Sequence, residues 1–307
     1  MSAPRVVRDI GEMRRIVAEF RASASAPGAD RRSTVGFVPT MGYLHEGHAS
    51  LLRRARDENN FVVLSVFVNP LQFGPREDFD RYPRDEARDL AVAAACGVDA
   101  VFMPPADVMY PSPPLTRVTV GKITERLCGA SRPGHFDGVA TVVTKLFHIV
   151  QPDRAYFGMK DAQQVAVVTQ MVNDLNMAVE VIPCPTVREP DGLALSSRNV
   201  YLNPEERRQA TVLYRTLQRA PGWIAAGADA ASLRERLLDS LAESPLAVVD
   251  YAEVVTWPDL APPPDGRPLR ELGVPLLVAL AVKFGQTRLI DNVLINPAEV
   301  TDPCSGT

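Results

Sequence analysis

The sequence predicts an α/β protein, with a doubly wound parallel (Rossmann-like) sheet and a second, smaller α+β domain. Over residues 30–185, short apolar runs alternate with amphipathic segments, the order expected of successive βαβ units. The run at 61–68 is continuously apolar rather than alternating, which indicates a strand covered on both faces. After Pro185 the pattern changes to helices, alternating strands and a proline-rich loop. We therefore predict two domains, at residues 1–185 and 186–307.

Periodicity assigns the elements of the first domain. Apolar residues at helical spacing predict helices at 9–21, 49–57, 85–95, 137–150 and 162–175. Runs rich in β-branched and aromatic residues predict strands at 35–38, 61–68, 98–103, 154–157 and 178–183. In sheets of this kind, ligands bind at the carboxyl ends of the strands, so the residues that follow each strand are the candidates for function.

The second domain begins after a linker near residues 184–190. Helices are predicted at 204–220 and 231–242, the first of them ending before Pro221. Three strands follow at 248–255, 276–283 and 288–293, all with alternating character.

Composition and charge exclude several classes of protein. Of the 307 residues, 46% are hydrophobic and 23% are charged, which is typical of a folded enzyme. A formal net charge of −4 argues against a nucleic-acid surface, because binding to phosphate backbones requires clustered Lys and Arg. The four cysteines form no C-x-x-C pair, a pattern that suits reduced thiols rather than disulfides or zinc.

The sequence shows no pattern typical of a secretory signal or of a membrane-spanning segment. Residues 2–30 contain charged side chains and no apolar segment typical of a secretory signal. The longest apolar runs, at 61–68 and 274–282, are far below the ~20 residues needed to span a bilayer. We expect a cytoplasmic protein with neither a nucleic-acid nor a membrane partner.

The most informative stretch is P-T-M-G-Y-L-H-E-G-H, at residues 39–48. It follows an apolar strand and precedes a helical segment, so it places a glycine-containing turn and a helix N-terminus at the end of that strand. Backbone N–H groups and the positive end of the helix dipole attract anions at such a position. His45 and His48 are three residues apart and share one helix face if the helix begins near Leu44. The stretch favours binding of nucleotide phosphates.

Two other interpretations fit part of this stretch. One histidine could cap the helix while the other is buried in the core. A zinc site is the second alternative, but metalloprotease helices carry H-E-x-x-H with histidines four apart, which is not the spacing here. Because the histidine pair, the glycines and the preceding strand occur together, we favour the phosphate site.

Polar residues also follow two other predicted strands. Asn69 and Gln72 come after the strand at 61–68, and Gln72 lies between apolar neighbours, where an amide needs hydrogen-bond partners. A structural Asn-Pro turn is the alternative for Asn69. Lys160 follows the strand at 154–157 and is a mobile cation suited to phosphate, with Gln164 one helical turn later. The alternative for Lys160 is a solvated surface lysine.

Three further segments complete the candidate set. His135, in R-P-G-H-F-D-G-V, precedes a helix and could contact substrate, cap the helix or belong to the core. Ser196, Ser197 and Arg198 form a hydroxyl-rich basic segment suited to clamping polyphosphate. Asp89 lies in an acidic run that could be a solvated face, and it is the candidate ligand for the Mg²⁺ that accompanies ATP chemistry.

Taken in order, these segments resemble a known family. P-T-M-G-x-L-H-x-G-H, F-V-N-P-x-Q-F, R-P-x-H-F-x-G-V, F-G-x-K-D-x-Q-Q and R-E-x-D-G-L-A-x-S-S-R-N, over roughly residues 33–205, are similar to the pantoate–beta-alanine ligase family of H-x-G-H nucleotidyltransferases. The resemblance implies ATP-dependent condensation of (R)-pantoate with beta-alanine, giving pantothenate, AMP and diphosphate through a pantoyl-adenylate. It also implies a homodimer that uses ATP and Mg²⁺.

The resemblance implies roles for individual residues, and it implies that the second domain closes over the ATP site. ATP would be bound by Pro39, Thr40, Met41, Gly42, His45, Gly47, His48, Gly158, Lys160, Asp161, Val187, Leu195, Ser196, Ser197 and Arg198. Pantoate and beta-alanine would be bound by Gln72, Gln164, Asn69 and His135, and Mg²⁺ by Asp89. The catalytic groups would be His48 (as proton donor), His45, Lys160, Ser196, Ser197 and Arg198.

The sequence departs from the family pattern at two places. Met159 stands where the F-G-x-K-D motif usually has Glu, and Arg88 and Val92 flank Asp89 where more polar metal ligands are usual. Two rival functions remain open at this stage. An adenylyltransferase acting on a phosphate acceptor would need cations where Gln72 and Gln164 stand. A non-catalytic nucleotide-binding module is the other rival, and the retained histidines and cations disfavour it.

Overall fold

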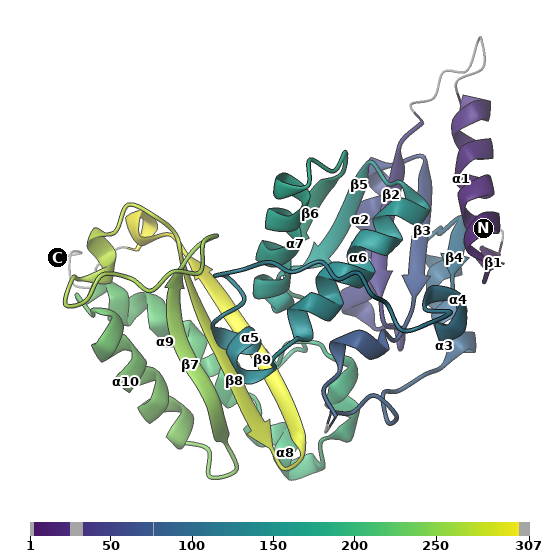
Figure 1. Cartoon of the computed structure of the whole chain (residues 1–307). Coiled ribbons are helices and arrows are strands. Elements are labelled where there is room, and N and C mark those ends of the chain that lie inside the picture. The colour runs from purple at the N-terminus through teal and green to yellow at the C-terminus, as the bar shows by residue number, and fades with distance from the viewer. Residues whose placement is uncertain (1–2, 25–32, 76, 301–307) are drawn as a thin grey trace. The chain divides into compact units, whose positions relative to one another are not determined.

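The computed structural model describes residues 3–24, 33–75 and 77–300 (Figure 1). The chain forms two compact units. The first consists of Met1–Gly121, Arg132–Met159 and Val167–Val187. The second consists of Arg188–Thr307 together with two short segments from the first part of the chain, Lys122–Ser131 and Lys160–Ala166.

The first unit is built on a parallel sheet of six strands in the order β1-β4-β3-β2-β5-β6. The strands are β1 (Arg5–Val7), β2 (Val35–Thr40), β3 (Phe61–Val66), β4 (Ala100–Phe102), β5 (Arg154–Gly158) and β6 (Glu180–Cys184). From β2 the chain builds outward through β3 to β4, then returns to add β5 on the other side of β2. Strand order therefore reverses between β2 and β5, the kind of switch point at which such sheets bind ligands. The predicted fold class is confirmed.

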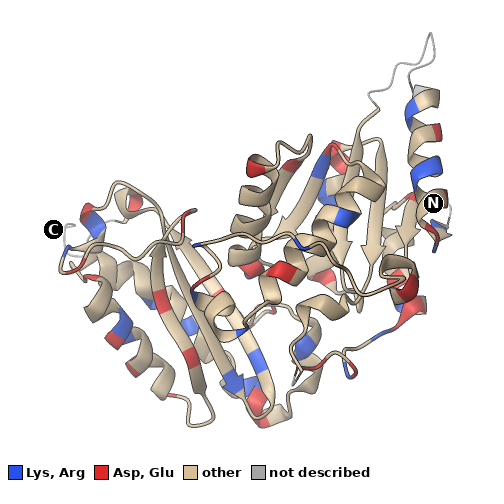
Figure 2. Ribbon diagram, in the orientation of Figure 1, with Lys and Arg blue, Asp and Glu red and all other residues tan. Residues whose placement is uncertain are grey.

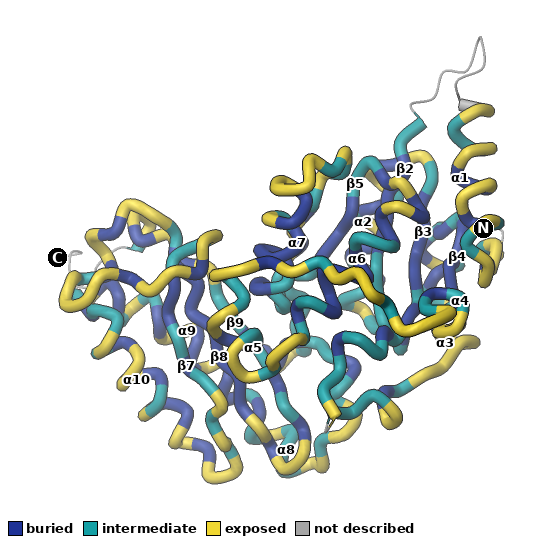
Figure 3. The backbone as a smooth tube through the Cα atoms, in the orientation of Figure 1, coloured by how far each residue is buried: buried dark blue, intermediate teal, exposed yellow. Residues whose placement is uncertain are grey.

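Helices cover both faces of this sheet. Val38, Leu64 and Tyr156 share a buried cluster with the apolar residues of α2 (Glu46–Glu58) and α3 (Glu86–Ala95). Residues one position away point to the opposite face, where Phe37 and Phe157 make edge contacts with Phe147 of α6 (His135–Val150). Both-face burial explains the continuously apolar strands, which are dark blue in Figure 3. The central strands β2, β3 and β4 carry no charged side chain, and the charged residues of this sheet, Arg5, Arg154 and Glu180, begin β1, β5 and β6 (Figure 2).

Most predicted elements of this unit differ from the observed ones by a few residues. The observed helices also include α1 (Ile10–Ala24) and α7 (Ala162–Asp174). The predicted strand at 61–68 ends at Val66: the Phe67 N–H makes the last bond to β2, at the Thr40 carbonyl, before the chain that follows β2 turns away at Gly42. Three short elements were not predicted: β1 and α4 (Ala106–Met109) in this unit, and α5 (Leu127–Ser131) in the second. They are too short to show a period.

The second unit contains an antiparallel sheet in the order β7-β8-β9. Its strands are β7 (Val248–Thr256), β8 (Leu276–Phe284) and β9 (Thr287–Ile295). The alternating character predicted for all three strands is wrong for β8, whose residues are buried except Lys283. Its residues on one face share the core cluster with the helices α9 (Val212–Ala225) and α10 (Ala230–Ala242), and Leu277, Ala279 and Ala281 on the opposite face are buried as well. The core is filled by leucines and valines of the sheet and of these two helices.

The helix predicted at 204–220 is two helices. α8 (Pro204–Gln209) ends at Ala210, where the hydroxyl of Thr211 bonds back to the Arg208 carbonyl and the chain makes a tighter turn. α9 then continues through Pro221, where the prediction ended. Proline removes one helical hydrogen bond, but the fully buried Ala220 and Ile224 on either side bury the helix in the core and offset that loss.

The remaining observations concern thiols and hydropathy. Cys96, Cys128 and Cys184 are buried free thiols, and Cys304 lies outside the described residues. Across the described residues, none of the helices combines the length and the apolar character required to cross a bilayer.

Candidate active site

The turn that follows β2 is closed at Gly42. Thr40, the last residue of β2, donates its hydroxyl to the Ser65 carbonyl at 2.8 Å and accepts the Gly42 N–H at 3.2 Å. Gly42 has φ +87°, and a Cβ there would lie 2.8 Å from Val66 and 2.9 Å from Asp89 Oδ2. Backbone conformation and space both require glycine, so this residue determines where the chain turns toward α2.

The two histidines form the cap of α2. His45 is the N-cap residue, its Nδ1 accepts the Gly47 N–H at 3.1 Å, and the Nδ1 of His48 accepts the His45 N–H at 3.3 Å. The ring centroids are 4.1 Å apart. Because each Nδ1 is an acceptor, a neutral ring carries its proton on Nε2. Both rings are half-buried, so the interpretation that one histidine belongs to the core is wrong.

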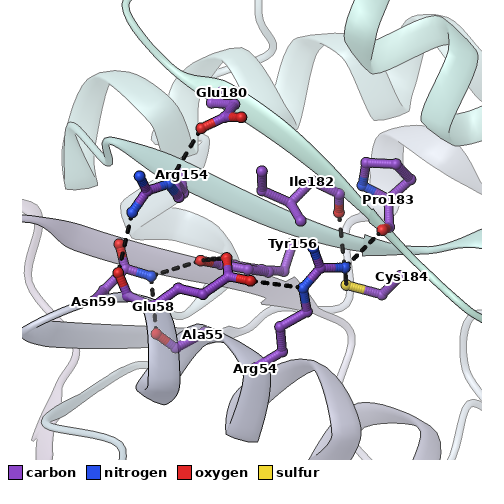
Figure 4. A network of polar contacts seen from close by, with 10 residues as sticks. All are labelled: Arg54, Ala55, Glu58, Asn59, Arg154, Tyr156, Glu180, Ile182, Pro183 and Cys184. Atoms are coloured by element: carbon purple, nitrogen blue, oxygen red, sulfur yellow. Dashed lines mark hydrogen bonds and ion pairs between the residues drawn. The ribbon is translucent and has the colours of Figure 1, made fainter.

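The opposite end of α2 is held by a polar network (Figure 4). The hydroxyl of Tyr156, which is fully buried in β5, donates to Glu58 Oε2 at 2.8 Å and accepts from Asn59 Nδ2 at 2.6 Å. Arg54 donates to the Glu58 carboxylate at 2.9 Å and to the Pro183 carbonyl at 3.0 Å. Burial and the hydrogen bond to Glu58 raise the pKa of Tyr156, so the hydroxyl remains protonated. The network ties α2 to β5 and β6.

Asp89, the predicted metal ligand, faces the turn instead. Its Oδ1 accepts the Leu44 N–H at 2.6 Å and its Oδ2 accepts the Tyr43 N–H at 3.0 Å. The residue is 1% exposed. Burial raises the pKa of this carboxyl, and the two N–H bonds oppose the rise. In the part of the chain that the structure describes, no three His, Cys, Asp or Glu side chains form a group that could hold a metal. Asp89 does not fit the role of a Mg²⁺ ligand.

Gln72, predicted to bind pantoate, lies beside the first motif. It ends the short helix η1 (Pro70–Gln72), is 8% exposed, and donates from Nε2 to the sulfur of Met41 at 3.0 Å. Asn69 donates from Nδ2 to Gln72 Oε1 at 3.2 Å and to the Gly138 carbonyl at 3.1 Å. Tyr110 donates to Asn69 Oδ1 at 2.9 Å, and burial raises the pKa of Tyr110 to about 12. The structure therefore brings Gln72, Asn69 and Met41 together.

His135 is directed at the backbone of Gln72. Its Nδ1 lies 2.8 Å from the Gln72 carbonyl, so Nδ1 carries the proton and Nε2 accepts from Arg132 Nη1 at 3.0 Å. Arg132 also makes a two-pronged ion pair with Glu77, at 2.6 and 2.7 Å. Burial would raise the pKa of Glu77, but the hydrogen bonds and charge of Arg132 outweigh it and hold that pKa below its ordinary value. The sequence suggested that His135 contacts substrate, caps the helix or belongs to the core. None of these interpretations predicted its hydrogen bond to the Gln72 carbonyl.

In the second unit, Lys160 and Asp161 belong to the turn η2 (Met159–Asp161), which follows Gly158 at the end of β5. The ammonium group of Lys160 lies 3.4 Å from Asp161 Oδ2, and the Lys160 carbonyl accepts from Asn292 Nδ2 at 2.8 Å. Gln164 is half-buried in the first turn of α7. Lys160 is not the solvated surface lysine of the alternative, because four-fifths of its side chain is covered.

The serine segment has its own support in the second unit. Ser196 caps the short helix η3 (Ser197–Tyr201) by accepting the Arg198 N–H, and Ser197 is 6% exposed. Upstream, Arg188 pairs through two hydrogen bonds with the buried carboxylate of Asp291, at 2.6 and 2.9 Å. Leu195 and Arg198 are half-buried, as is Val187, the last residue of the first unit.

Sequence reasoning missed the side chains that hold these groups in place. They are Arg132, Glu77, Tyr110, Arg188 and Asp291. A signal was available for Arg132 and Arg188, since each arginine opens one of the motifs singled out in the sequence. Their carboxylate partners lie 55 and 103 residues away, and nothing in the local pattern identifies them.

Comparison with known proteins gives one consistent result. Residues 5–294 match the family model described as pantoate-beta-alanine ligase. The pantothenate synthetase of Pelotomaculum thermopropionicum is 54% identical over 291 residues, covering 94% of this chain and 98% of that protein. A pantothenate synthetase structure from Thermus thermophilus has a TM-score of 0.82 at 50% identity, covering 94% of this chain and 98% of that one. A pantoate-beta-alanine ligase structure from Francisella tularensis, complexed with beta-gamma ATP and beta-alanine, has a TM-score of 0.75 at 33% identity, covering 96% and 100%.

Proposed function

The chain belongs to the pantoate-beta-alanine ligase family, and from this premise we propose how its residues divide the work. The enzyme condenses (R)-pantoate with beta-alanine at the expense of ATP, producing pantothenate, AMP and diphosphate through a pantoyl-adenylate. One observation carries the assignment of the site. The buried amide of Gln72, a neutral group suited to orienting a carboxylic acid, contacts Met41, which lies in the turn that leads from β2 to the capped histidine pair beside the switch point of the sheet.

We propose that the first unit supplies hydrogen-bond donors for the nucleotide and the Gln72 contact to the acid. We propose that ATP contacts the turn from Pro39 to Gly42 and the imidazoles of His45 and His48. When neutral, each of these rings carries its proton on Nε2, since Nδ1 accepts a backbone N–H. In the adenylation step the pantoate carboxylate attacks the α-phosphorus and diphosphate leaves, so the protein must align the reactants and stabilise developing charge.

Gln72 is the proposed contact to pantoate in this unit. A neutral amide can orient a carboxylic acid without neutralising it, whereas a bidentate arginine would stabilise the anion and weaken its attack. The amide is directed by Asn69 at 3.2 Å, and its main chain is held by His135 at 2.8 Å. Both of those side chains are committed to bonds within the protein, so we propose that they position Gln72 rather than bind substrate themselves.

The second unit carries the proposed cationic groups. Lys160, Ser196, Ser197 and Arg198 are the groups proposed to bind the polyphosphate, and Gln164 is proposed as the second amide for pantoate. Lys160 lies 3.4 Å from Asp161, which holds its ammonium group at the end of a fixed turn. We propose that this unit closes over bound ATP, as the resemblance implies.

The second half-reaction needs an amine nucleophile. The amine of beta-alanine attacks the carbonyl of the pantoyl-adenylate, the bond to the phosphate oxygen breaks, and AMP leaves with the electron pair. We propose that His48, when neutral, donates a hydrogen bond from its Nε2–H to the phosphate oxygen of the departing AMP and so stabilises the charge that develops there, rather than transferring the proton. The attacking nitrogen loses its extra proton to solvent as the amide forms.

Product analysis tests the function. The protein is incubated with ATP, Mg²⁺ and pantoate, with and without beta-alanine, and the products are identified by mass spectrometry. We expect pantoyl-adenylate and diphosphate without the amine, and pantothenate and AMP with it. A phosphorylated acceptor that supports AMP transfer as fast as pantoate would refute the proposal in favour of an adenylyltransferase.

The assignment of the amides is tested separately by calorimetry. Gln72→Ala and Gln164→Ala are expected to weaken pantoate binding at a cost of about 1–3 kcal/mol each and to leave ATP affinity nearly unchanged. An equal loss for ATP would mean that the acid pocket lies elsewhere. We also propose a cytoplasmic homodimer, which light scattering and cell fractionation would test.

A further inference from the structure

We propose that Arg88 and Asp89 form a clamp on the turn Gly42–Leu44, and that Asp89 positions His45 and His48 instead of binding Mg²⁺. The clamp joins the first turn of α3 to the loop between β2 and α2, within the first unit. The proposal deepens the function proposed above and rests on it for the meaning of the histidines.

Asp89 satisfies two consecutive backbone N–H groups. Its oxygens lie 2.6 Å from the Leu44 nitrogen and 3.0 Å from the Tyr43 nitrogen, one oxygen for each. Tyr43 has φ +52°, a left-handed conformation that a residue with a side chain seldom adopts. Such a conformation persists where surrounding contacts enforce it, and the carboxylate supplies those contacts.

Arg88 completes the clamp from the other side. Its Nε donates to the Leu44 carbonyl at 3.0 Å, and its guanidinium carbon lies 4.6 Å from the centroid of the Tyr43 ring. Both backbone polar groups of Leu44 are therefore bonded to α3. Leu44 is fully buried and directly precedes His45, the N-cap residue whose backbone N–H binds His48. Fixing Leu44 fixes the start of α2 and the orientation of both rings.

The same geometry excludes a metal at Asp89. Mg²⁺ requires near-octahedral oxygen ligands about 2.1 Å away and keeps several waters. A carboxylate that is 1% exposed and bonded through both oxygens to the backbone leaves no room for a hydrated ion. The positive charge of Arg88, which acts on the Asp89 carboxylate, repels a metal ion there. A Mg²⁺ ion that accompanies ATP would thus be held by phosphate oxygens.

The deciding measurement is ATP affinity with and without metal. Calorimetry with Mg²⁺ and, separately, with EDTA is carried out on the wild type, Asp89→Asn, Arg88→Gln and the control Asp85→Asn. Asp85 caps the same helix, is exposed, and loses the same charge, while Asn remains a good capping residue. We expect Asp89→Asn to lower ATP affinity about tenfold or more in both conditions, because a hydrogen bond to a charged group is lost.

The ratio of the two affinities separates the interpretations. For Asp89→Asn, the ratio of the ATP affinity with Mg²⁺ to the ATP affinity with EDTA is expected to stay within about twofold of the wild-type ratio. The same is expected for Asp85→Asn. A loss confined to the Mg²⁺ condition would overturn the proposal and make Asp89 a metal ligand. Unchanged affinity in both conditions would overturn the clamp. If Asp89→Asn does not fold, Arg88→Gln serves the same test, with a smaller metal-independent loss expected.

A second readout needs no ligand. The chain has four histidines, so nitrogen-15 spectra of the imidazoles can be resolved without ATP. The wild type is expected to show Nε2–H tautomers for His45 and His48. In Asp89→Asn, both should shift toward mixed tautomers while His148 stays unchanged. Unmoved signals would refute the positioning role. A wild type that binds no ATP would refute the proposed function, and the spectra would still test the clamp.

Discussion

Replacing Gly138 by alanine should push η1, which carries the proposed pantoate contact Gln72, away from the helix α6 that packs against it. Gly138 lies in the first turn of α6, and a Cβ there would be 2.3 Å from the Leu71 carbonyl oxygen and 2.6 Å from Gln72 Cα. Both of these atoms are backbone, so no side chain can rotate away to make room. The carbonyl of Gly138 also accepts a hydrogen bond from Asn69, which directs Gln72.

The size of the effect follows from these distances. Side-chain Cβ atoms essentially never come closer than 3.0 Å, so η1 and α6 must separate by about 0.7 Å. Overpacking of this kind typically costs about 1–3 kcal/mol in stability. A displacement approaching 1 Å of a positioned group can reduce catalysis by about 10²-fold. We expect the KM for pantoate to rise by about 10- to 100-fold while the KM for ATP changes by less than about twofold.

Steady-state kinetics with each substrate varied in turn, together with urea unfolding, measures both effects. Gly121→Ala is the matched control, because a Cβ at Gly121 would meet no atom within 4 Å. Pantoate kinetics in Gly138→Ala that match those of Gly121→Ala would refute the reasoning. That result would mean either that η1 moves freely or that Gln72 does not bind the acid.

Three other changes have defined outcomes. Tyr156→Phe should lower the free energy of unfolding by about 1–3 kcal/mol, because Asn59 loses a buried hydrogen bond and Glu58 a partly buried one; urea unfolding with an unchanged midpoint would contradict this. Glu77→Gln should destabilise the protein at pH 7, and the difference from wild type should shrink as the pH falls below about 4.3, because a lowered pKa stabilises the fold only while the carboxylate is ionised. Unfolding at several pH values measures it, and a constant difference would argue against the Arg132 pair as the cause. Lys160→Ala should slow pantoyl-adenylate formation by about 10²–10³-fold in single turnover with little change in melting temperature; a near-normal rate would reject its role.

The central strands of the sheet could be predicted because strands buried on both faces are continuously apolar in sequence. β2, β3 and β5 are apolar at nearly every position, and several residues proposed to bind substrates follow their ends. The resemblance suggested which residues these are. β1 has only three residues, too few to form a recognisable apolar run. Its place is set by pairing with β4, more than ninety residues later in the chain.

The roles of polar side chains were harder to predict than their positions. A carboxylate at Asp89 is compatible with a metal or with two N–H groups, and only the fold decides which of these it meets. His135 was recognised as part of a motif, but its contact with Gln72 depends on the close packing of α6 against η1. Pro221 shows the reverse case, in which a strong local signal to end a helix is overridden by burial of the residues around it.

The short strand β1 has a consequence for handling the protein. It pairs with β4 through residues Arg5, Val6 and Val7, and so occupies one edge of the sheet. All three residues of β4 are fully buried. Trimming the chain to residue 8 or beyond would leave an apolar strand with unpaired N–H and carbonyl groups, which other chains can pair with. Such a shortened chain should aggregate during expression even though every proposed substrate-binding residue is intact.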